Sequence, residues 1–276
     1  MTINCNGNLI DLSTPKVMGI LNITPNSFFD GGKFIQEGDI LLQTKKMISD
    51  GATFIDIGAY SSKPNAEFVS ENEELKRIVP IVSLILEHFP DAIISIDTFR
   101  SEVARICIEN GASMINDISA GNGDEKMMET VAKYNVPYIM MHNRGTPETM
   151  QTMTHYENIV KEILFYFSEK MSLARSFGIN DLIIDPGFGF AKTLDQNYEV
   201  LQKLELFEML ELPLLVGVSR KSMIYNLFKY TPEEALNGTT IINTIALTKG
   251  AKILRVHDVK EAMECVTLFN KTNPIL

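Results

Sequence analysis

The sequence predicts an α/β fold, namely a (β/α)8 barrel that follows a short N-terminal β-hairpin. Short apolar runs alternate with longer amphipathic segments along nearly all of the 276 residues, which is the pattern of repeated strand–helix units in a parallel sheet. Eight such units can be distinguished, and the chain length is usual for a barrel of this kind. We therefore expect a single domain that covers residues 1–276.

The predicted strands are short and apolar, as strands covered on both faces usually are. In chain order they occupy residues 17–22, 54–57, 93–96, 114–116, 138–141, 182–184, 214–218 and 253–256. Before them, residues 2–12 have the pattern of a small hairpin that turns at Asn6 and Gly7, since Asn-Gly favours a tight two-residue turn. We expect this hairpin to cover the bottom of the barrel.

Amphipathic segments that separate these runs are predicted to be helical. They comprise residues 39–50, 71–87, 101–110, 125–134, 156–177, 195–204, 221–228 with 232–249, and 258–270. A glycine follows four of them, where a left-handed C-terminal cap is expected: Gly51, Gly111, Gly178 and Gly250. The alternative is an open, doubly wound sheet, which the absence of the glycine-rich phosphate-binding motifs disfavours.

The net charge and the cysteine content indicate the cellular compartment of the protein and the classes of partner that it does not bind. The formal net charge of −10 argues against non-specific binding of nucleic acid. Cys5, Cys107 and Cys265 are odd in number and form no CxxC pair, which predicts reduced thiols in the cytoplasm. The sequence shows neither a signal peptide nor an apolar run long enough to cross a membrane, so we expect no membrane partner.

Polar groups close or follow each predicted strand, and the carboxyl ends of barrel strands are where active sites form. These groups are Asn22, Ser62 and Lys63, Asp97, Asn116 and Asp117, His142, Asp185, Ser219 to Lys221, and Arg255 with His257. For Asp117, Ser219 and Asp258 the alternative is that they cap the following helix. For His142, packing or a loop hydrogen bond is favoured over catalysis.

Five basic residues at these strand ends predict a positive rim on an otherwise acidic protein: Lys63, Arg220, Lys221, Arg255 and His257. Such a local cluster can bind a pyrophosphate group. Asp97 and Asp185 need a different partner, because a carboxylate in an apolar barrel mouth is costly unless it is paired.

A planar heterocycle with adjacent N–H donors can pair these carboxylates. Asn116 offers both a donor and an acceptor to such a ring, while Met141, Phe188 and Phe190 could form flat apolar walls. For Met141, ordinary barrel packing is an equal alternative. The residues alone therefore predict a site for a planar polar heterocycle and a phosphate group. A Mg²⁺ ion that arrives with pyrophosphate and takes one protein ligand is compatible with this site.

Several motifs, taken in order, resemble those of the dihydropteroate synthases. They are residues 18–32 (MGILNITPNSFFDGG), 94–98 (ISIDT), 115–118 (INDI), 185–190 (DPGFGF), 219–222 (SRKS) and 255–259 (RVHDV), and the resemblance extends from about Val17 to Met263. It implies an enzyme of folate biosynthesis that condenses 6-hydroxymethyl-7,8-dihydropterin pyrophosphate with p-aminobenzoate. The products would be 7,8-dihydropteroate and pyrophosphate, formed by a dissociative displacement.

The resemblance also implies site roles, a Mg²⁺ ion and a homodimer. Asp97, Asp185 and Lys221 would be catalytic, and the pterin would be held by Asp97, Asn116, Met141, Asp185, Phe190, Gly217 and Lys221. Asn22, Lys63, Arg255 and His257 would bind pyrophosphate, with Asn22 as the metal ligand. Ser62, Lys63, Pro64, Phe190, Lys221 and Ser222 would bind p-aminobenzoate and the sulfonamides that mimic it.

One motif departs from the family pattern. The second signature usually contains Glu-Ser-Thr-Arg-Pro-Gly, whereas residues 60–65 read Tyr-Ser-Ser-Lys-Pro-Asn. Lys63 keeps the positive charge but lacks the planar guanidinium that can form two parallel bonds. Two other functions remain open from sequence: a methyltetrahydrofolate-dependent methyltransferase, which has no need of the phosphate groups at 219–222 and 255–258, and a noncatalytic pterin-binding paralogue.

Overall fold

The computed structural model describes residues 1–23, 37–60, 69–146 and 149–273. It begins with the predicted hairpin, in which β1 (Thr2–Cys5) pairs antiparallel with β2 (Asn8–Asp11). The turn residues Asn6 and Gly7 have φ values of 50° and 87°, the left-handed conformation that a tight hairpin turn requires.

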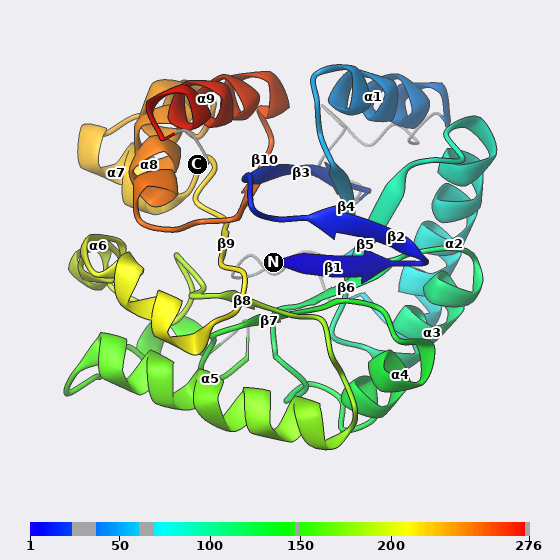
Figure 1. Ribbon diagram of the computed structural model, residues 1–276, viewed down its shortest axis with the longest axis horizontal. Helices are drawn as coiled ribbons and strands as arrows, with labels where there is room; N and C mark the ends of the chain where they lie inside the picture. The colour runs from blue at the N-terminus through cyan, green and yellow to red at the C-terminus, as the bar shows by residue number, and fades with distance from the viewer. Residues whose placement is uncertain (24–36, 61–68, 147–148, 274–276) are drawn as a thin grey trace.

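Eight parallel strands form the predicted barrel (Figure 1). They are β3 (Lys16–Asn22), β4 (Phe54–Gly58), β5 (Ile93–Asp97), β6 (Met114–Asp117), β7 (Tyr138–Met141), β8 (Leu182–Asp185), β9 (Leu215–Val216) and β10 (Ile253–Val256). The hydrogen-bonded order is β8-β7-β6-β5-β4-β3-β10-β9, and a single parallel bridge between Ile184 and Leu214 joins the two ends.

Helices surround the strands (Figure 1). They are α1 (Glu37–Ser49), α2 (Glu71–His88), α3 (Ser101–Glu109), α4 (Met127–Tyr134), α5 (Ile159–Ser176), α6 (Leu194–Gln202), α7 (Ser222–Phe228), α8 (Leu236–Thr248) and α9 (Val259–Thr272), with short 3₁₀ turns at Met150–Thr152, Leu204–Leu210 and Glu233–Ala235. All four glycines expected at helix ends have positive φ values, between 90° and 102°.

Several predicted boundaries were wrong by two to four residues. Helix α1 begins at Glu37 rather than at residue 39, α6 ends at Gln202 rather than at 204, α8 begins at Leu236 rather than at 232, and α9 ends at Thr272 rather than at 270. Helix α4 begins at Met127 rather than at residue 125, and α5 begins at Ile159 because the side chain of Asn158 caps it, accepting a bond from the Lys161 amide. Strand β9 ends at Val216 rather than at residue 218. There the chain leaves the ladder for a turn in which the Lys221 amide donates to the Val218 carbonyl.

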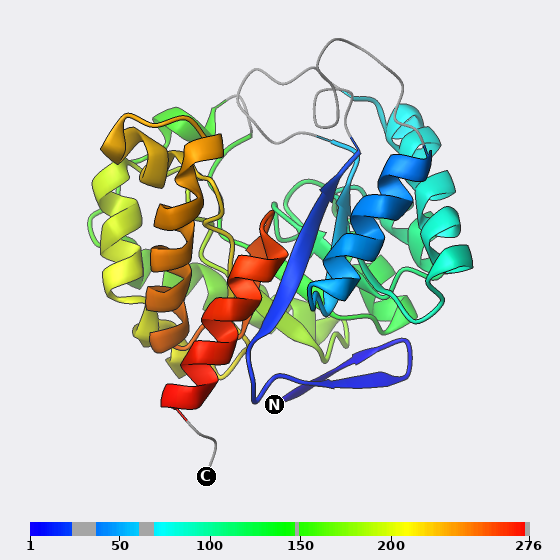
Figure 2. The same ribbon diagram turned by 90° about the horizontal axis from the view of Figure 1, so that it is seen from above.

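The barrel interior is apolar at the amino ends of the strands. Ile3, Cys5 and Leu12 of the hairpin region pack against one inward-facing residue from most of the strands, namely Met18, Phe54, Met114, Ile139, Ile183, Leu215 and Ile253. A larger cluster lies between the strands and the helices. Figure 2 shows the hairpin at one end of the barrel. The prediction that it covers the bottom is confirmed.

Among the helices of the described segments, none is both long enough and apolar enough to span a bilayer.

Candidate functional site

Side chains alternate between the two faces of a strand, so the residue two positions beyond each apolar interior residue also faces the barrel interior. In this second layer the residue types change. Two positions beyond the apolar residues Phe54, Met114, Ile183, Leu215 and Ile253 stand, in the same order, Asp56, Asn116, Asp185, Gly217 and Arg255. One step of the strand period thus converts an apolar plug into a polar barrel mouth.

Arg255 lies at the centre of this mouth and pairs with two carboxylates. Its Nε donates to Asp56 Oδ2 at 2.6 Å, and its Nη2 donates to Asp97 Oδ2 at 2.6 Å. Asn116 Nδ2 donates to the same Asp56 oxygen at 3.0 Å. Four side chains from β4, β5, β6 and β10 are therefore joined in one network. The two carboxylates raise the pKa of Arg255 above its ordinary value.

The carboxylates of Asp56 and Asp97 thus share one guanidinium, and this sharing affects the pKa of Asp97. Burial raises the pKa of Asp97, Arg255 opposes that change, and the charge of Asp56 adds to it. Asp56 Oδ1 and Ser95 Oγ are buried without a hydrogen-bond partner in the part of the chain that the structure describes, and strand register pairs these two residues. Buried acceptors without donors are costly, so the part of the mouth formed by Asp56 and Ser95 suits a ligand rich in N–H groups.

Asp185, Gly217 and Lys221 form the opposite side of the mouth. The Gly187 amide donates to Asp185 Oδ1 at 2.8 Å. Burial raises the pKa of Asp185, and the positive charge of Lys221 is the largest opposing influence. A Cβ atom placed on Gly217 would lie 3.8 Å from Asp185 Oδ2 and 3.9 Å from Arg255 Cβ. The missing side chain at Gly217 therefore keeps the space between these two groups open.

Lys221 holds the turn that follows β8. Its Nζ donates to the Phe188 carbonyl and lies 4.5 Å from the centre of the Phe190 ring. Burial lowers the pKa of Lys221 to about 8, while Asp185 opposes the change. Met141 lies opposite Asp185 in the register of β7 and β8 and is 3% exposed. Ser222 directly follows Lys221 as the first residue of α7.

Asn22 lies at the next level toward the rim, beside Asp97. Strand register places Asn22, Gly58 and Asp97 in one row across β3, β4 and β5. A Cβ atom on Gly58 would lie 3.6 Å from Asn22 Oδ1 and 3.7 Å from Asp97 Oδ2. Amide and carboxylate oxygens are the ligands that Mg²⁺ prefers, so these groups fit the predicted metal. No group of three or more acidic, histidine or cysteine ligands occurs among the described residues.

The predicted positive rim is wrong for Arg220. Its guanidinium folds back and makes two bonds to the carboxylate of Asp258, at 2.9 and 2.6 Å. Asp258 stands at the start of α9 but does not cap it with its side chain. His257 is exposed and lies with Nδ1 3.0 Å from Ser219 Oγ. Thus Arg255 and Lys221 lie in the mouth, His257 lies at its edge, and Arg220 serves the fold.

Asp117, for which capping was the alternative, holds the loop after β6 instead. Its carboxylate accepts bonds from the Ser119 amide, the Gly121 amide and the Tyr138 hydroxyl. Of the other predicted residues, Ser62, Lys63 and Pro64 lie outside the described residues. Sequence reasoning missed Asp56, because it considered the polar groups at or beyond the end of each apolar run, and for the run 54–57 these are Ser62 and Lys63. The available signal was a single carboxylate within the apolar run 54–57.

Comparison with known proteins gives the same family throughout. The model of the pterin binding enzyme family matches residues 18–257. The dihydropteroate synthase of Escherichia coli is 42% identical over 274 residues, which cover 99% of this chain and 96% of that protein. The Yersinia pestis dihydropteroate synthase, solved as a sulfonamide drug complex, is 40% identical with a TM-score of 0.94 over 100% of both chains. The Xanthomonas albilineans dihydropteroate synthase, solved with 4-aminobenzoic acid, is 33% identical with a TM-score of 0.92, covering 100% of this chain and 99% of that one.

Proposed function

The chain belongs to the dihydropteroate synthases, within the pterin-binding enzymes, and from this membership we propose how its barrel mouth performs the reaction. The enzyme is a transferase of folate biosynthesis. It joins the pterinylmethyl group of 6-hydroxymethyl-7,8-dihydropterin pyrophosphate to p-aminobenzoate, giving 7,8-dihydropteroate and pyrophosphate. This membership excludes the methyltransferase alternative, and turnover distinguishes the enzyme from a noncatalytic paralogue.

The pterin ring occupies the mouth between the Asp56–Asp97–Arg255 network and Asp185. The observation that carries this assignment is the set of three carboxylates in one buried mouth, of which Asp56 presents a buried Oδ1 that lacks a partner within the described structure. The ring's N–H and amino groups satisfy these acceptors. Asn116 adds an amide, Met141 and Phe190 supply apolar contact, and Gly217 leaves room for the ring.

The reaction proceeds by cleavage of the C–O bond before the new C–N bond is complete. Pyrophosphate leaves with the electron pair of that bond, and positive charge on the methylene spreads into the pterin ring. The carboxylates of Asp97 and Asp185 stabilise this charge because they are fixed beside the ring before it develops. The aniline nitrogen of p-aminobenzoate then attacks the methylene carbon and afterwards loses a proton. Lys221, a third catalytic residue, holds the turn that carries Phe190.

The leaving pyrophosphate lies at the rim, near Asn22, Arg255 and His257, and Lys63 would be its fourth partner. Arg255 has five N–H groups, of which Asp56 and Asp97 take two, so others remain for a phosphate. The amide oxygen of Asn22 would bind a Mg²⁺ ion that enters with the substrate. The ion would neutralise charge on the leaving group.

The p-aminobenzoate site lies beside the pterin site. Phe190 provides a ring face, and Lys221 and Ser222 provide polar groups at the start of α7. Ser62, Lys63 and Pro64 would complete this site. Lys63 stands where the family usually has arginine. A lysine ammonium cannot form the two parallel bonds to an oxyanion that a planar guanidinium forms.

A homodimer is the expected assembly. Exposed apolar side chains occur on the late helices, including Leu227 and Phe228 of α7 and Ile241 and Ile245 of α8. A groove of about 480 Å³ between α6 and α8 is lined by Tyr198, Leu201 and Ile245 with three polar residues. A second copy of the chain would cover these side chains, and sedimentation equilibrium measures the resulting mass. The three cysteines are free and buried, which is compatible with the reducing cytoplasm.

Substitution of Asp185 tests the pterin assignment. Asp185→Asn places an amide donor where the ring also presents donors, so it removes a charge-assisted pair and leaves a group unpaired. We expect pterin affinity to fall by about 1–3 kcal/mol or more in isothermal titration. Asp91→Asn is the matched control, since Asp91 is exposed and directly precedes the residues that lead into β5. Unchanged pterin affinity in Asp185→Asn, with the control also unchanged, would contradict the assignment.

A further inference from the structure

Lys192 is a buried lysine that belongs to none of the site roles described above. It follows the turn between β8 and α6 and is 5% exposed. Its Nζ donates to the Gly187 carbonyl at 2.9 Å and to the Phe190 carbonyl at 3.1 Å, and lies 3.1 Å from His142 Nδ1. Burial lowers the pKa of Lys192 to about 7, and the charge of Asp185 opposes the change. In its protonated form the amine has three N–H bonds, which match these three acceptors.

The turn that Lys192 holds has an unusual backbone. Gly187, Gly189 and Ala191 have φ values of 71°, 80° and 47°, and the left-handed conformation of Ala191 is costly for a residue with a side chain. Such a conformation persists only where surrounding contacts determine it. The bonds of Lys192 fix both ends of the segment 187–190. Asn197 Oδ1 accepts from the Gly189 amide at 2.7 Å between them.

Every group of this turn that faces the mouth depends on its position. The Gly187 amide donates to Asp185 while the Gly187 carbonyl accepts from Lys192. The Phe188 carbonyl accepts from Lys221, and the Phe190 ring lies beside the Lys221 amine. A shift of the turn would therefore move an orienting bond of Asp185 and the Phe190 wall, and would release Lys221.

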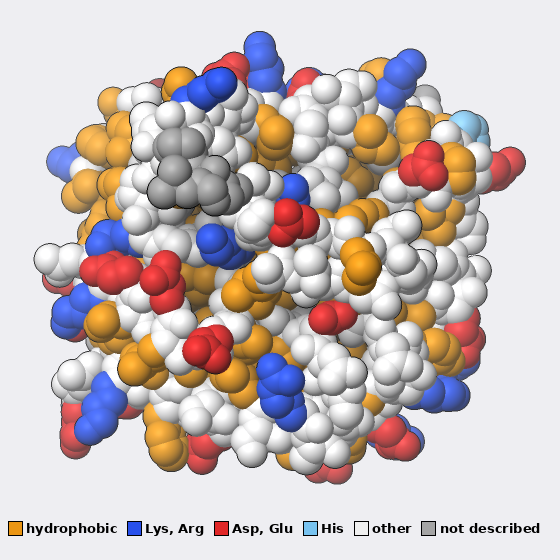
Figure 3. Space-filling model, viewed as in Figure 1, with side chains coloured by type: hydrophobic (Ala, Val, Ile, Leu, Met, Phe, Trp, Pro, Cys, Tyr) orange, Lys and Arg blue, Asp and Glu red, His pale blue; other side chains and the backbone are white. Residues whose placement is uncertain are grey.

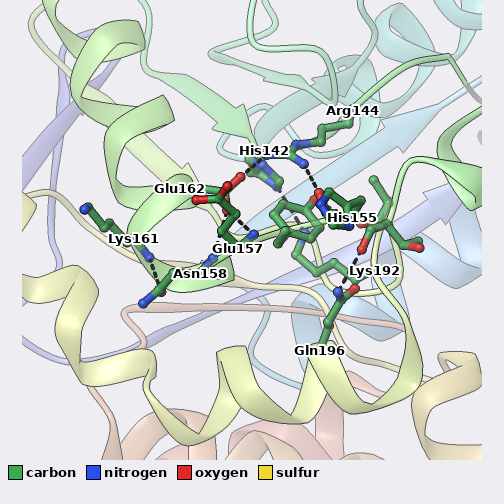
Figure 4. A network of polar contacts seen from close by, with 12 residues as sticks. His142, Arg144, His155, Glu157, Asn158, Lys161, Glu162, Lys192 and Gln196 are labelled. Atoms are coloured by element: carbon green, nitrogen blue, oxygen red, sulfur yellow. Dashed lines mark hydrogen bonds and ion pairs between the residues drawn. The ribbon is translucent and has the colours of Figure 1, made fainter.

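His142 supports Lys192 from the end of β7 (Figure 4). Its ring is 1% exposed and packs edge-on against Tyr166, with the ring centres 4.9 Å apart. Burial and the nearby positive charges of Lys192 and Arg144 lower the pKa of His142 well below its ordinary value. A neutral ring can accept from the ammonium at Nδ1.

The neighbouring loop supports the turn from outside but does not reach the same carbonyls. Arg144 stacks over the Tyr156 ring at 3.8 Å, and the Tyr156 hydroxyl donates to the Ala191 carbonyl at 2.9 Å. Gln196 of α6 donates to the Thr154 carbonyl at 2.8 Å (Figure 4). These contacts hold the outer part of the turn, whereas Lys192 alone among the described side chains bonds to both Gly187 and Phe190 carbonyls.

We propose that Lys192 is a positioning residue of the synthase reaction, which holds the turn 187–190 so that Asp185, Phe190 and Lys221 meet the pterin and p-aminobenzoate. His142 is its third acceptor and fixes the direction of the amine. The inference rests on the proposed use of Asp185 and Phe190 in the barrel mouth. It adds a residue outside the substrate contacts that controls substrate affinity through backbone geometry.

Two substitutions separate the donor bonds from mere space filling. Lys192→Met keeps the length of the side chain but has no donor, whereas Lys192→Gln keeps two N–H donors for the carbonyls. We expect the KM for the pterin substrate to rise at least about tenfold in Lys192→Met and less in Lys192→Gln, since small displacements of positioning groups are costly. The control is Lys203→Met, which removes an exposed lysine paired with Glu199 at 2.8 Å.

Kinetics of all four proteins are measured well below the melting temperature of each. Wild-type-like KM and kcat in Lys192→Met would overturn the inference, as would a lower melting temperature with unchanged KM. If Lys192→Met does not fold, Lys192→Leu, which also lacks a donor, takes its place, and an unchanged KM for the pterin substrate in that variant would count against the inference. Inactivity of the wild type and of Lys203→Met would instead contradict the proposed function.

Discussion

At the scale of single residues, the mouth is organised by one guanidinium shared between two carboxylates. Arg255 and Asn116 were predicted from their place at the end of a strand, and Asp97 and Asp185 from their place directly after one. Asp56 was not, although the period of the strand would have found it two positions beyond the inward-facing Phe54. The pairing of Arg220 with Asp258 could not be predicted, because it joins residues 38 positions apart through the closed barrel.

Asp56→Asn tests the role of the missed residue. An amide oxygen at the Oδ2 position can still accept from Arg255 and Asn116, so we expect a loss of stability of only about 1 kcal/mol, from the weaker bond to Arg255. The Oδ1 acceptor becomes a donor, however, and pterin affinity should fall by at least about tenfold, or 1.4 kcal/mol. Denaturant unfolding and isothermal titration measure the two quantities.

The control for this variant is Asp91→Asn, at an exposed position before β5. Pterin affinity equal to that of the wild type in Asp56→Asn would show that the unpartnered oxygen does not face the ring. A large loss of stability instead would show that Asp56 serves mainly to hold Arg255.

At the scale of elements, existence and type could be predicted, while ends could not always be. All eight strands and the surrounding helices follow from the alternation of apolar runs and amphipathic segments. The predicted ends were wrong where a few local hydrogen bonds determine where an element begins or stops, as at Asn158 before α5 or in the turn after β9. The geometry of the turn 187–191 was also beyond prediction, because Lys192 fixes it only when its side chain is directed by His142, 50 positions earlier in the chain.

A pair of glycines separates backbone strain from crowding in this turn. Gly187 and Gly178 have φ values of 71° and 90°, so alanine at either costs about 1–2 kcal/mol. A Cβ atom on Gly187 would lie 2.1 Å from the His142 carbonyl oxygen, whereas one on Gly178 would meet nothing within 4 Å. We expect Gly187→Ala to lose more stability than Gly178→Ala and to raise the KM for the pterin substrate.

Thermal unfolding and steady-state kinetics of both variants check this expectation. Equal stabilities with wild-type KM in both would mean that the turn relaxes without moving Asp185.

At the scale of the whole molecule, stability and function lie at opposite ends of the barrel. The hairpin and the apolar plug close the amino ends of the strands, and the polar mouth lies at the carboxyl ends, as is usual for this fold. On the face that carries the hairpin, acidic and basic side chains are scattered rather than gathered (Figure 3). The barrel class could be predicted from the repeating pattern. Its closure through Ile184 and Leu214 could not, since it depends on strand stagger.

Ile3→Ala tests this separation. Ile3 is 2% exposed in the plug beneath the barrel, so its truncation should cost about 2–4 kcal/mol of folding free energy. Kinetic constants should remain those of the wild type, because the second layer of side chains separates the plug from the substrates. A changed KM for either substrate would show that the two ends are coupled.

If this mouth transfers the pterinylmethyl group to p-aminobenzoate, one pyrophosphate is released for each dihydropteroate formed. Purified enzyme is mixed with the pterin pyrophosphate and Mg²⁺, with and without p-aminobenzoate, and both pyrophosphate and dihydropteroate are quantified. We expect sustained release only with p-aminobenzoate, in equal amounts with dihydropteroate, and a sharp decrease in Asp185→Asn. No release, or release at the same rate without p-aminobenzoate, would contradict the account.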